Sequence, residues 1–334
     1  MSQILIAEGV TKRFSPNISL GDRIAGALGA HVDKRAVHAV TDVSLSVTAG
    51  ETLGLVGESG CGKSTLGRML AGIMAPTEGR VLVSGVAPMK GRHKATTRIQ
   101  TVFQDPFASL NPRMRIGDSI AEGPVTHGLT TRAAAPRMVA DWLARVGLDP
   151  AFATRFPHQF SGGQRQRVAI ARAPAMQPEM LVCDEPVASL DVSIQAQILN
   201  LFLDLRRDLG LTCLFISHDL SVVRHVSDRV AVMYVGRIVE TGPTTALYDR
   251  PLHPYTAALM ASVPKPDPDQ RDATPPLAGD VADAANIPAG CAFHPRCPHA
   301  VSRCREIRPE LRETIPGRMT ACHRAEELTL AGVD

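Results

Sequence analysis

Gly57-Glu58-Ser59-Gly60-Cys61-Gly62-Lys63-Ser64-Thr65 is the stretch that decides how this sequence is interpreted. It fits the phosphate-loop pattern, in which a glycine and four further residues precede Gly-Lys-Ser. Glycines let the backbone curl tightly, so that its N–H groups converge on phosphate oxygens without a Cβ in the way. The helix that we expect to open at Lys63 adds the positive end of its dipole. Lys63 is therefore predicted to reach the terminal phosphates, and the Ser64 hydroxyl to bind Mg²⁺.

The residues around the loop predict a strand before it and a helix after it. Glu51-Thr52-Leu53-Gly54-Leu55-Val56 is short and apolar enough for a buried strand. After the loop, apolar residues recur at helical spacing, namely Leu66, Met69, Leu70 and Ile73. A glycine-rich turn can match the loop pattern by chance, but such a turn needs neither flanking element. The order of strand, loop and helix therefore predicts an α/β fold that binds a nucleotide.

The composition is that of a globular protein without a strong charge bias. Of the 334 residues, 44% are hydrophobic and 21% are charged, and the net charge is +3. The basic residues are scattered, so the charge pattern does not require a nucleic acid partner. The first residues lack the basic and apolar regions of a secretion signal, and no apolar run approaches the ~20 residues that span a bilayer. We therefore expect any role at a membrane to depend on a partner.

Further short apolar runs predict the remaining strands. These strands are expected within 3–14, 37–47, 75–85, 99–103, 180–183, 211–216, 230–234 and 237–240. Residues 105–160 are interpreted as a helical insertion in the α/β fold. Val139 and Val146 belong to a set of apolar residues at helical spacing, and Gly147 can end that helix. Residues 264–288 are rich in proline, aspartate and alanine, and are expected to form an extended linker.

The second motif is an apolar strand that ends in two carboxylates, Met180-Leu181-Val182-Cys183-Asp184-Glu185. In a parallel sheet this order places Asp184 and Glu185 at the carboxyl edge, where ligands bind. Asp184 is predicted to hold Mg²⁺ through water, and Glu185 to polarise the water that attacks the γ-phosphate. An Asp-Glu pair by itself is more often a helix cap or a surface turn, so this prediction depends on the phosphate loop.

The third motif, Phe160-Ser161-Gly162-Gly163-Gln164-Arg165-Gln166-Arg167, predicts a second anion site. Ser161 can cap a helix, and the two glycines after it expose backbone N–H groups at the positive end of that helix. Pro174 is expected to limit the length of the helix, because proline lacks a backbone donor. One chain has little use for two separate sites on one triphosphate, whereas two chains packed head to tail would use both.

With these three motifs the chain resembles the ATP-binding subunits of ABC transporters, in which the signature Ser161–Gln164 separates the family from other phosphate-loop ATPases. The resemblance implies a RecA-like core with a helical subdomain, and ATP with Mg²⁺ as ligands. Gln104 matches the glutamine that senses Mg²⁺ and faces the membrane partner, and His218 matches the switch histidine that contacts the γ-phosphate. Ser189-Leu190-Asp191 matches the loop that links two nucleotide sites, and Phe14 matches the aromatic residue that stacks on adenine.

Two other stretches resemble the oligopeptide/dipeptide importer branch of that family. They are Phe103-Gln104-Asp105-Pro106-Phe107-Ala108-Ser109-Leu110-Asn111-Pro112 and His253-Pro254-Tyr255-Thr256-Ala257-Ala258-Leu259. The tail from Pro264 to Cys322 resembles this branch as well. Cys61-Gly62-Lys63-Ser64-Thr65, together with Asp105, resembles the second of that system's two ATPases. The implied division of the chain is an ATP-binding core, a helical subdomain and a small C-terminal extension of metal-binding type. The core comprises residues 1–104 and 161–250, the helical subdomain residues 105–160, and the C-terminal extension residues 251–334.

The resemblance implies an ATPase that powers a peptide importer. Its implied partners are a second ABC ATPase subunit in a heterodimer, two membrane permease subunits and, indirectly, an extracytoplasmic solute-binding protein. Its implied location is the cytoplasmic face of the bacterial inner membrane, to which it would be peripheral. The transported solute stays open, because dipeptides, longer peptides, nickel chelates and glutathione-like solutes all fit.

Three other classes of protein are less consistent with the sequence. A soluble ABC ATPase that acts on nucleic acid or ribosomes is expected to carry two cassettes in one chain, or an inserted coiled coil or zinc module. A small-molecule kinase with a phosphate loop does not need the signature Ser161–Gln164. An exporter would often carry fused membrane helices.

Four of the seven cysteines, Cys291, Cys297, Cys304 and Cys322, lie after residue 290. Such a cluster favours metal binding over disulfides in a chain without an export signal, and four thiolates suit Zn²⁺ or a 4Fe-4S cluster. The spacing lacks the paired two-residue gaps of zinc ribbons, and the importer resemblance implies the iron–sulfur cluster. The alternative is a small apolar knot of reduced thiols. Because the cysteines are far in sequence from the nucleotide motifs, we expect a structural role for them and no direct role in hydrolysis.

Overall fold

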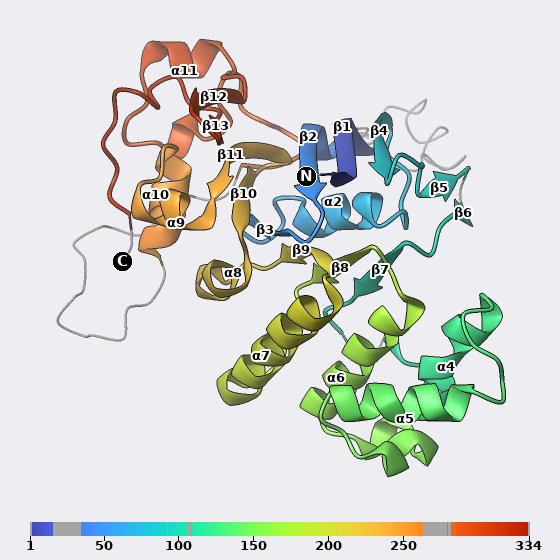
Figure 1. Cartoon of the computed structure of the whole chain (residues 1–334). Helices are drawn as coiled ribbons and strands as arrows, with labels where there is room; N and C mark the ends of the chain where they lie inside the picture. Colours follow the sequence, from blue (N-terminus) through green and yellow to red (C-terminus); the bar gives the residue numbers. More distant parts are fainter. Residues whose placement is uncertain are drawn as a thin grey trace, which may run out of the picture.

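The computed structural model describes residues 2–15, 35–91, 93–105, 109–262, 279 and 282–332. Within these residues the main sheet has eight strands in the order β12-β13-β11-β10-β3-β9-β8-β7, and a second sheet has three in the order β2-β1-β4. Figure 1 shows the smaller sheet above the middle of the main sheet, a group of helices below it, and the C-terminal part of the chain to the left.

Parallel strands form one side of the main sheet, from β10 to the edge strand β7. Their bounds are β3 (Thr52–Val56), β7 (Ile99–Val102), β8 (Met180–Asp184), β9 (Thr212–Ile216) and β10 (Arg229–Tyr234). Every residue of β3, β8 and β9 is buried, as expected for continuous apolar strands that are covered on both faces. β3 pairs in parallel with β9, and β9 pairs in parallel with β8. The carboxyl ends of these three strands therefore meet at one edge of the sheet.

Helix α2 lies between the two sheets (Figure 1). The elements here are β1 (Gln3–Phe14), β2 (Val37–Thr48), α2 (Lys63–Leu70), β4 (Glu78–Val83) and the short hairpin of β5 (Met89–Lys90) and β6 (His93–Lys94). Leu66, Met69 and Leu70 of α2 are buried in one core cluster with side chains from both sheets. Ile73, which the spacing assigns to the same apolar stripe, lies beyond the helix and is 44% exposed.

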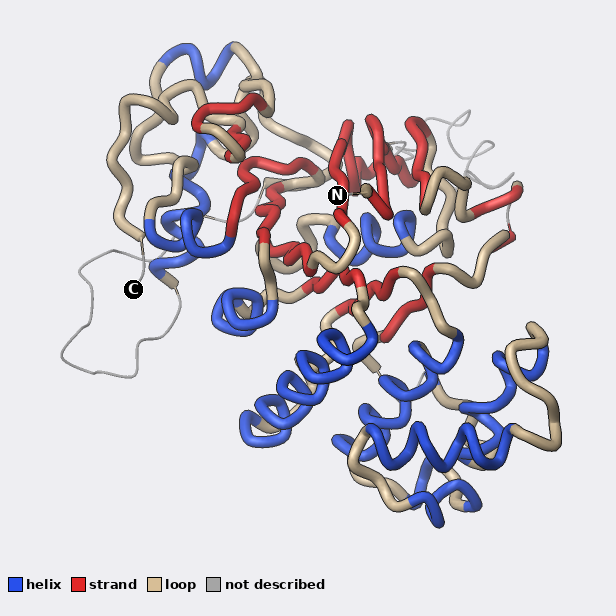
Figure 2. Tube along the Cα trace, viewed as in Figure 1, coloured by secondary structure: helices blue, strands red, loops and turns tan. Residues whose placement is uncertain are grey.

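A group of helices covers the end of the sheet near β7 and β8 (Figures 1 and 2). They are α4 (Ile116–Thr126), α5 (Ala135–Arg145), α6 (Gly162–Arg172) and α7 (Val192–Leu209), with 3-10 turns at Pro150–Thr154, Pro157–Gln159 and Pro174–Met176. The predicted end of α5 is confirmed, because Gly147 follows it with φ +70. α6 ends at Arg172, before Pro174, as the proline predicts.

The C-terminal residues extend the main sheet. Their elements are β11 (Arg237–Pro243), α9 (Thr244–Asp249), α10 (Pro254–Ala261), the turn His294–Arg296, α11 (Ser302–Glu306), β12 (Arg312–Ile315) and β13 (Arg318–Thr320); α8 (Leu220–Val226) precedes them. β13 pairs with β11, the outer strand of the predicted hairpin. Phe293 packs its ring against Tyr234 of β10 and Tyr255 of α10. The tail therefore shares the core of the α/β fold and does not form a separate knot.

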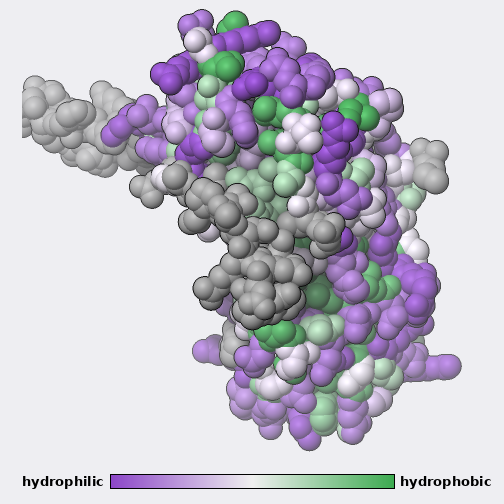
Figure 3. All heavy atoms as spheres, turned by 90° about the vertical axis from the view of Figure 1, so that its left-hand side faces the viewer, coloured by the Kyte–Doolittle hydropathy of each residue, from purple (hydrophilic) through white to green (hydrophobic). Residues whose placement is uncertain are grey.

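The strands expected from the sequence are confirmed, each within a few residues of its predicted bounds. Helices α7 to α11 and strands β12 and β13 are elements that the sequence did not predict. Most of the expected linker, 264–288, and the centre of the importer-like stretch after Phe103 lie outside the described residues. Among the described residues, no helix combines the length and the hydropathy needed to cross a bilayer. The surface around the C-terminal part mixes hydrophilic residues with small groups of hydrophobic ones (Figure 3).

A buried ion pair joins the tail to the sheet. The Glu240 carboxylate on β11 has no exposed surface and accepts hydrogen bonds from the backbone N–H groups of Leu252 and His253, both at 2.9 Å. Arg318 of β13 donates to Glu240 Oε1 at 2.7 Å and to the carbonyl of Arg250 at 2.6 Å. One carboxylate thus connects three segments of the chain that are far apart in the sequence.

We expect Arg318→Ala to lower the free energy of unfolding by about 3–5 kcal/mol, because it leaves the Glu240 charge buried without its partner. Urea denaturation followed by circular dichroism measures the loss. The control is Arg207→Ala, which breaks an exposed ion pair with Asp204 on α7 and should change stability little. Equal effects of the two substitutions would show that the buried pair does not hold the tail to the sheet.

Candidate functional site

The phosphate loop connects the end of β3 to the start of α2, as predicted. Its glycines are required by close backbone approaches: a Cβ on Gly57 would lie 2.2 Å from the carbonyl oxygen of Met233, and one on Gly62 would lie 2.1 Å from that of Ala39. Both have φ in the region that favours glycine, 153° and 106°. Ser59 and Gly60 at the tip are exposed. The loop is therefore wedged against two neighbouring strand ends while its tip faces solvent.

Lys63 and Ser64 lie at the start of α2, where the helix dipole is positive. The Lys63 side chain is buried, and its Nζ donates to the carbonyl oxygens of Gly57 at 2.8 Å and Glu58 at 3.0 Å. The Ser64 hydroxyl donates to Asp184 Oδ1 at 2.9 Å. A hydroxyl and a carboxylate are oxygen ligands that suit Mg²⁺, so the donor set fits the metal that a bound nucleotide would bring. Thr65 follows in the same first turn and is half-buried.

Asp184, Glu185 and His218 meet at the carboxyl edge of the sheet. Burial raises the pKa of Asp184 above its usual value, and the hydrogen bond from Ser64 opposes that effect. Glu185 follows with φ +49, a left-handed conformation that a residue with a Cβ rarely adopts, and its N–H donates to the carbonyl of Ile216 at 3.0 Å. Its Oε2 lies 3.3 Å from Nδ1 of His218. The structure thus brings together the predicted base and the predicted switch histidine.

Phe14 and Gln104 lie at the borders of this edge. Phe14 is the last residue of β1 and its ring is 41% exposed, as a surface for stacking requires, with Lys12 Nζ 5.5 Å from the ring centre. Gln104 is exposed two residues beyond the end of β7. Val102 at the end of β7 pairs with Cys183 of β8, so Gln104 and Glu185 follow the carboxyl ends of adjacent strands. Their roles toward adenine and Mg²⁺ stay predictions.

The signature Ser161–Gln164 caps α6, as predicted. Ser161 Oγ accepts from the N–H of Gln164 at 3.3 Å, and Gln164 Oε1 accepts from the N–H of Ser161 at 3.0 Å. A Cβ on Gly163 would lie 2.6 Å from Ile194, whereas one on Gly162 would meet only Leu190 at 3.9 Å. Ser161 and Gly162 are exposed. They lie in the helical part of the molecule, apart from α2 and the phosphate loop (Figure 1).

Ser189-Leu190-Asp191 runs on the surface beside the signature. Ser189 and Asp191 are exposed, and Asp191 is the N-cap of α7. Leu190 lies beside the start of α6, since a Cβ on Gly162 would be 3.9 Å from the Leu190 side chain. The predicted linking loop is thus continuous with the signature surface, and both leave their polar groups open to another molecule.

The tail contacts the phosphate loop, which sequence reasoning missed. The N–H of Glu58 donates to the hydroxyl of Tyr255 at 2.9 Å, and Arg296 donates through both terminal nitrogens to the two Glu58 oxygens at 2.8 and 2.9 Å. Tyr255 belongs to a stretch that the importer resemblance had marked, but no local pattern indicated its partner. The tail is far from the nucleotide motifs in sequence but touches the phosphate loop in space. The expectation that its cysteines have no direct role in hydrolysis stays a prediction.

The four tail cysteines line one small cavity, together with His253, His294, His299 and His323. Burial raises the pKa of the Cys291 and Cys322 thiols to about 11. In the part of the chain that the structure describes, no group of three His, Cys, Asp or Glu side chains is placed to hold a metal ion. The expected extension of metal-binding type, with its 4Fe-4S or Zn²⁺ site, is thus not supported by the arrangement of these side chains.

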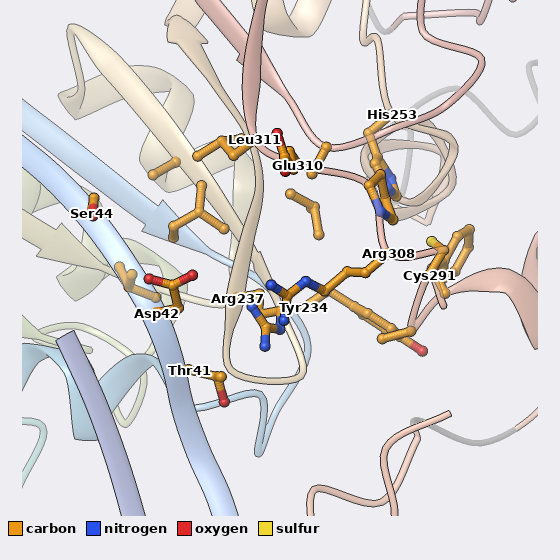
Figure 4. A pocket seen from close by; sticks show the side chains of 18 of the residues that line it. Thr41, Asp42, Ser44, Tyr234, Arg237, His253, Cys291, Arg308, Glu310 and Leu311 are labelled. Carbon is orange, nitrogen blue, oxygen red and sulfur yellow. The ribbon is translucent and has the colours of Figure 1, made fainter. Parts of the chain in front are cut away.

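A large cavity of about 1190 Å³ lies away from the phosphate loop. It lies between β2, β11 and the tail, and Arg237 and Arg308 extend into it side by side with Asp42 nearby (Figure 4). Burial and the neighbouring charge of Arg308 lower the pKa of Arg237. None of the residues from Gly57 to Thr65 lines this cavity. This cavity therefore does not mark the predicted nucleotide site.

Comparison with known proteins agrees with the geometry of the sheet edge. A model of the ABC transporter family matches residues 40–188, and a model of the C-terminal region of oligopeptide/dipeptide transporters matches residues 239–304. The oligopeptide transport ATP-binding protein AppF of Bacillus subtilis is 52% identical over 86% of this chain and 89% of its own. The "Probable peptide ABC transporter ATP-binding protein y4tS" of Sinorhizobium fredii is 52% identical over 86% of this chain and 82% of its own.

Solved structures share the fold. One is cbiO1 of Clostridium perfringens, part of the ABC transporter complex cbiONQ, with a TM-score of 0.59 and 26% identity over 74% of this chain and 91% of that one. Another is the ATP-binding cassette MJ0796, in a dimeric post-hydrolysis state bound to ADP and Pi, with a TM-score of 0.59 and 26% identity over 72% of this chain and 98% of that one.

Glu185→Gln is expected to lower the rate of ATP hydrolysis by on the order of 10²–10⁴, because an amide cannot accept a proton from the attacking water. ATP affinity should stay within about twofold, since Glu185 is not among the groups that cradle the phosphates. Steady-state phosphate release and nucleotide titration measure the two quantities. Glu179→Gln is the matched control, because Glu179 lies at the opposite end of β8 and pairs with Arg98. Normal turnover by the Glu185 variant would remove its assignment as the base.

Proposed function

The chain belongs to the ATP-binding proteins of ABC transporters, in their oligopeptide/dipeptide branch, and we propose that it powers peptide import by closing on ATP against a second ATPase subunit. It hydrolyses ATP, and the energy of ATP binding and hydrolysis drives the change in shape that moves the peptide. The observation that carries the proposal is the division of the nucleotide-binding groups between two surfaces of one chain.

One surface is the sheet edge. Lys63 and the N–H groups of the phosphate loop bind the phosphates, while Ser64 and Asp184 hold the Mg²⁺ that accompanies ATP. Glu185, held 3.3 Å from His218, orients and deprotonates the attacking water. When bound between these residues, Mg²⁺ would neutralise charge that develops on the phosphates. Gln104, which follows the end of the strand next to β8, would sense the metal.

The other surface is the signature. Ser161 and Gly162 are exposed at the N-terminus of α6, in a different part of the chain from the phosphate loop. Helix N-termini bind anions, so this end suits the γ-phosphate of a nucleotide held by another subunit. Binding of ATP at such an interface stabilises the closed dimer, and hydrolysis removes the γ-phosphate that joins the two halves.

The remaining parts of the proposal concern the assembly. We place the chain at the cytoplasmic face of the bacterial inner membrane, in a heterodimer with a second ABC ATPase and in contact with two permease subunits. An extracytoplasmic solute-binding protein would deliver the peptide. The division into a core (1–104 and 161–250), a helical subdomain (105–160) and a C-terminal extension (251–334) belongs to the same proposal. We also place a helix of a permease subunit between the core and the helical subdomain, near residue 104.

The cysteine-lined cavity supports one further part of the proposal, an iron–sulfur cluster. A single Zn²⁺ requires its four sulfurs within about 2.3 Å of one point. A four-iron cluster binds each cysteine through a different iron and accepts sulfurs that are further apart. Cys291, Cys297, Cys304 and Cys322 line one cavity in common, and this shared lining is the observation behind this part of the proposal.

Anaerobic purification followed by iron, zinc and sulfide analysis tests this part. We expect about four irons per chain with matching sulfide and a broad visible absorbance. One zinc without colour would replace the cluster by a zinc site. Absence of metal, with Cys304→Ser leaving the tail as resistant to protease as before, would leave four reduced thiols packed in the core.

Gly162→Asp tests the shared nucleotide site. Because a side chain at position 162 meets only Leu190 at 3.9 Å, the fold should accept the substitution. The new carboxylate would repel the γ-phosphate held by the partner and block closure. We expect MgATP binding by the isolated chain to be unchanged, and peptide uptake by proteoliposomes containing the assembled transporter to be lost.

The control for this experiment is Ala134→Asp. It adds the same charge at an exposed residue just before α5, away from the signature, and should leave uptake unchanged. Loss of ATP affinity in the isolated Gly162 variant would place the signature in its own nucleotide site. Unimpaired uptake by that variant would contradict the shared site altogether.

A further inference from the structure

Glu58 is the residue at which the C-terminal tail meets the phosphate loop. Its N–H donates to Tyr255, and its carbonyl oxygen accepts from Lys63 Nζ at 3.0 Å. Its carboxylate receives both terminal nitrogens of Arg296, in the two-pronged geometry that makes arginine–carboxylate pairs strong. Its carbonyl oxygen also accepts from the N–H of Cys61 at 3.3 Å. Backbone donor, backbone acceptor and side chain of this one residue are thus all engaged, and the partners of the N–H group and of the carboxylate come from the tail.

The pair is well shielded from solvent. The Arg296 side chain is 6% exposed and the Glu58 side chain 22%. The hydrogen bonds to Glu58 raise the pKa of Arg296 above its usual value, so the guanidinium keeps its charge. Water therefore screens the interaction less than it screens an exposed ion pair, and removal of either partner leaves a charge without compensation.

Rigid aromatic packing fixes the position of Arg296. Phe293, three residues before it, is buried with its ring 5.3 Å from that of Tyr234 and 5.4 Å from that of Tyr255. Tyr234 and Tyr255 pack on each other at 4.6 Å. Arg296 is also the residue directly before Cys297, in the cysteine-bearing segment. The guanidinium is thus held by the same cluster that holds the Tyr255 hydroxyl.

The chemistry of the loop shows why this position matters. Glu58 places a negative charge in a loop whose function is to bind the phosphates of ATP, which are themselves strongly negative. An unpaired carboxylate there would repel the phosphates, whereas a carboxylate neutralised by a buried guanidinium would not. The same pairing also holds the loop backbone in place, because the Glu58 side chain cannot move without losing two hydrogen bonds.

The tail reaches the nucleotide site at a second point. The N–H of His38 donates to the carbonyl of Ala284 at 3.0 Å. His38 lies at the start of β2, where the neighbouring residue Val37 is paired with Phe14, the predicted adenine platform. Tail residues therefore contact the core next to both the phosphate end and the expected adenine end of the site.

We propose that Arg296 is a positioning residue for ATP binding, through which the C-terminal tail neutralises Glu58 and holds the phosphate loop ready for the nucleotide. This inference rests on the proposed binding of ATP at the phosphate loop. It assigns the tail a direct influence on nucleotide affinity, where the sequence alone had suggested only a structural role.

The test compares MgATP affinity in the purified full-length chain, by titration calorimetry, for Arg296→Gln, Glu58→Gln and the double variant. We expect Arg296→Gln to weaken binding by about tenfold, because the Glu58 charge is then uncompensated next to the phosphates. Glu58→Gln should bind at least as tightly as the wild type. The double variant should return to within about twofold of the wild type, because it contains neither charge.

Thermal unfolding of the same proteins separates positioning from general stability. Arg303→Gln is the matched control, since it removes one exposed positive charge from α11 of the same tail and should change neither quantity. If Arg296→Gln lowers the melting temperature but leaves ATP affinity unchanged, the pair is only structural and the proposal is wrong. If the double variant binds as weakly as Arg296→Gln, charge neutralisation is not the mechanism. Should Arg296→Gln fail to fold, loss of affinity in Glu58→Gln would by itself contradict the predicted sign.

The same experiment distinguishes this inference from the proposed function. A wild-type chain that did not bind MgATP would overturn the proposed function. A wild-type chain that bound MgATP with an affinity indifferent to Arg296 would leave the proposed function intact and overturn only the role of the tail.

Discussion

The parallel pairing of three buried strands is the constraint on which the rest of the structure depends. β3, β9 and β8 lie side by side in the same direction, so the phosphate loop, His218 and the Asp184–Glu185 pair all emerge at one edge. This arrangement brings Ser64 to 2.9 Å from Asp184 and His218 to 3.3 Å from Glu185, although these residues are far apart in the chain. In an antiparallel sheet alternate strands end at opposite edges, and the same residues could not meet.

The same edge explains why the tail became part of the nucleotide site. β10 lies next to β3 and leads into the β10–β11 hairpin, whose outer strand accepts β13. A tail with strands as short as β12 and β13 buries too little apolar surface to fold alone, so it completes its core with Tyr234 from the sheet. Packing on Tyr234 brings Tyr255 and Arg296 to the loop residue Glu58. The packing that stabilises the tail therefore also places Tyr255 and Arg296 against the phosphate loop.

The cost of buried charge gives these contacts their specificity. Glu240 and Arg318 are a buried pair on the far side of the tail, and Glu58 and Arg296 form another beside the phosphate loop. Each pair is tolerable only while both members are present, so the tail has one register on the core and not several. Glu185 carries a cost in backbone strain, because its φ lies in the left-handed region. A hydrogen bond to Ile216 at the end of β9 holds this conformation, at the residue proposed as the base.

The roles of Phe14, Gln104 and His218 were assigned through the family resemblance and stay predictions. Local patterns in the sequence were enough to predict the strands, the phosphate loop and the capped signature helix. Each depends on a period, a glycine or a cap within a few residues, and short-range sterics and hydrogen bonding determine these features. The pairing of Glu58 with Arg296, the addition of β13 to the sheet and the arrangement of the four tail cysteines were decided only by tertiary structure. They depend on the free edge of β11 and on the aromatic surface of Tyr234, which become available only when the core has formed. Patterns within a few residues of the sequence cannot predict such contacts.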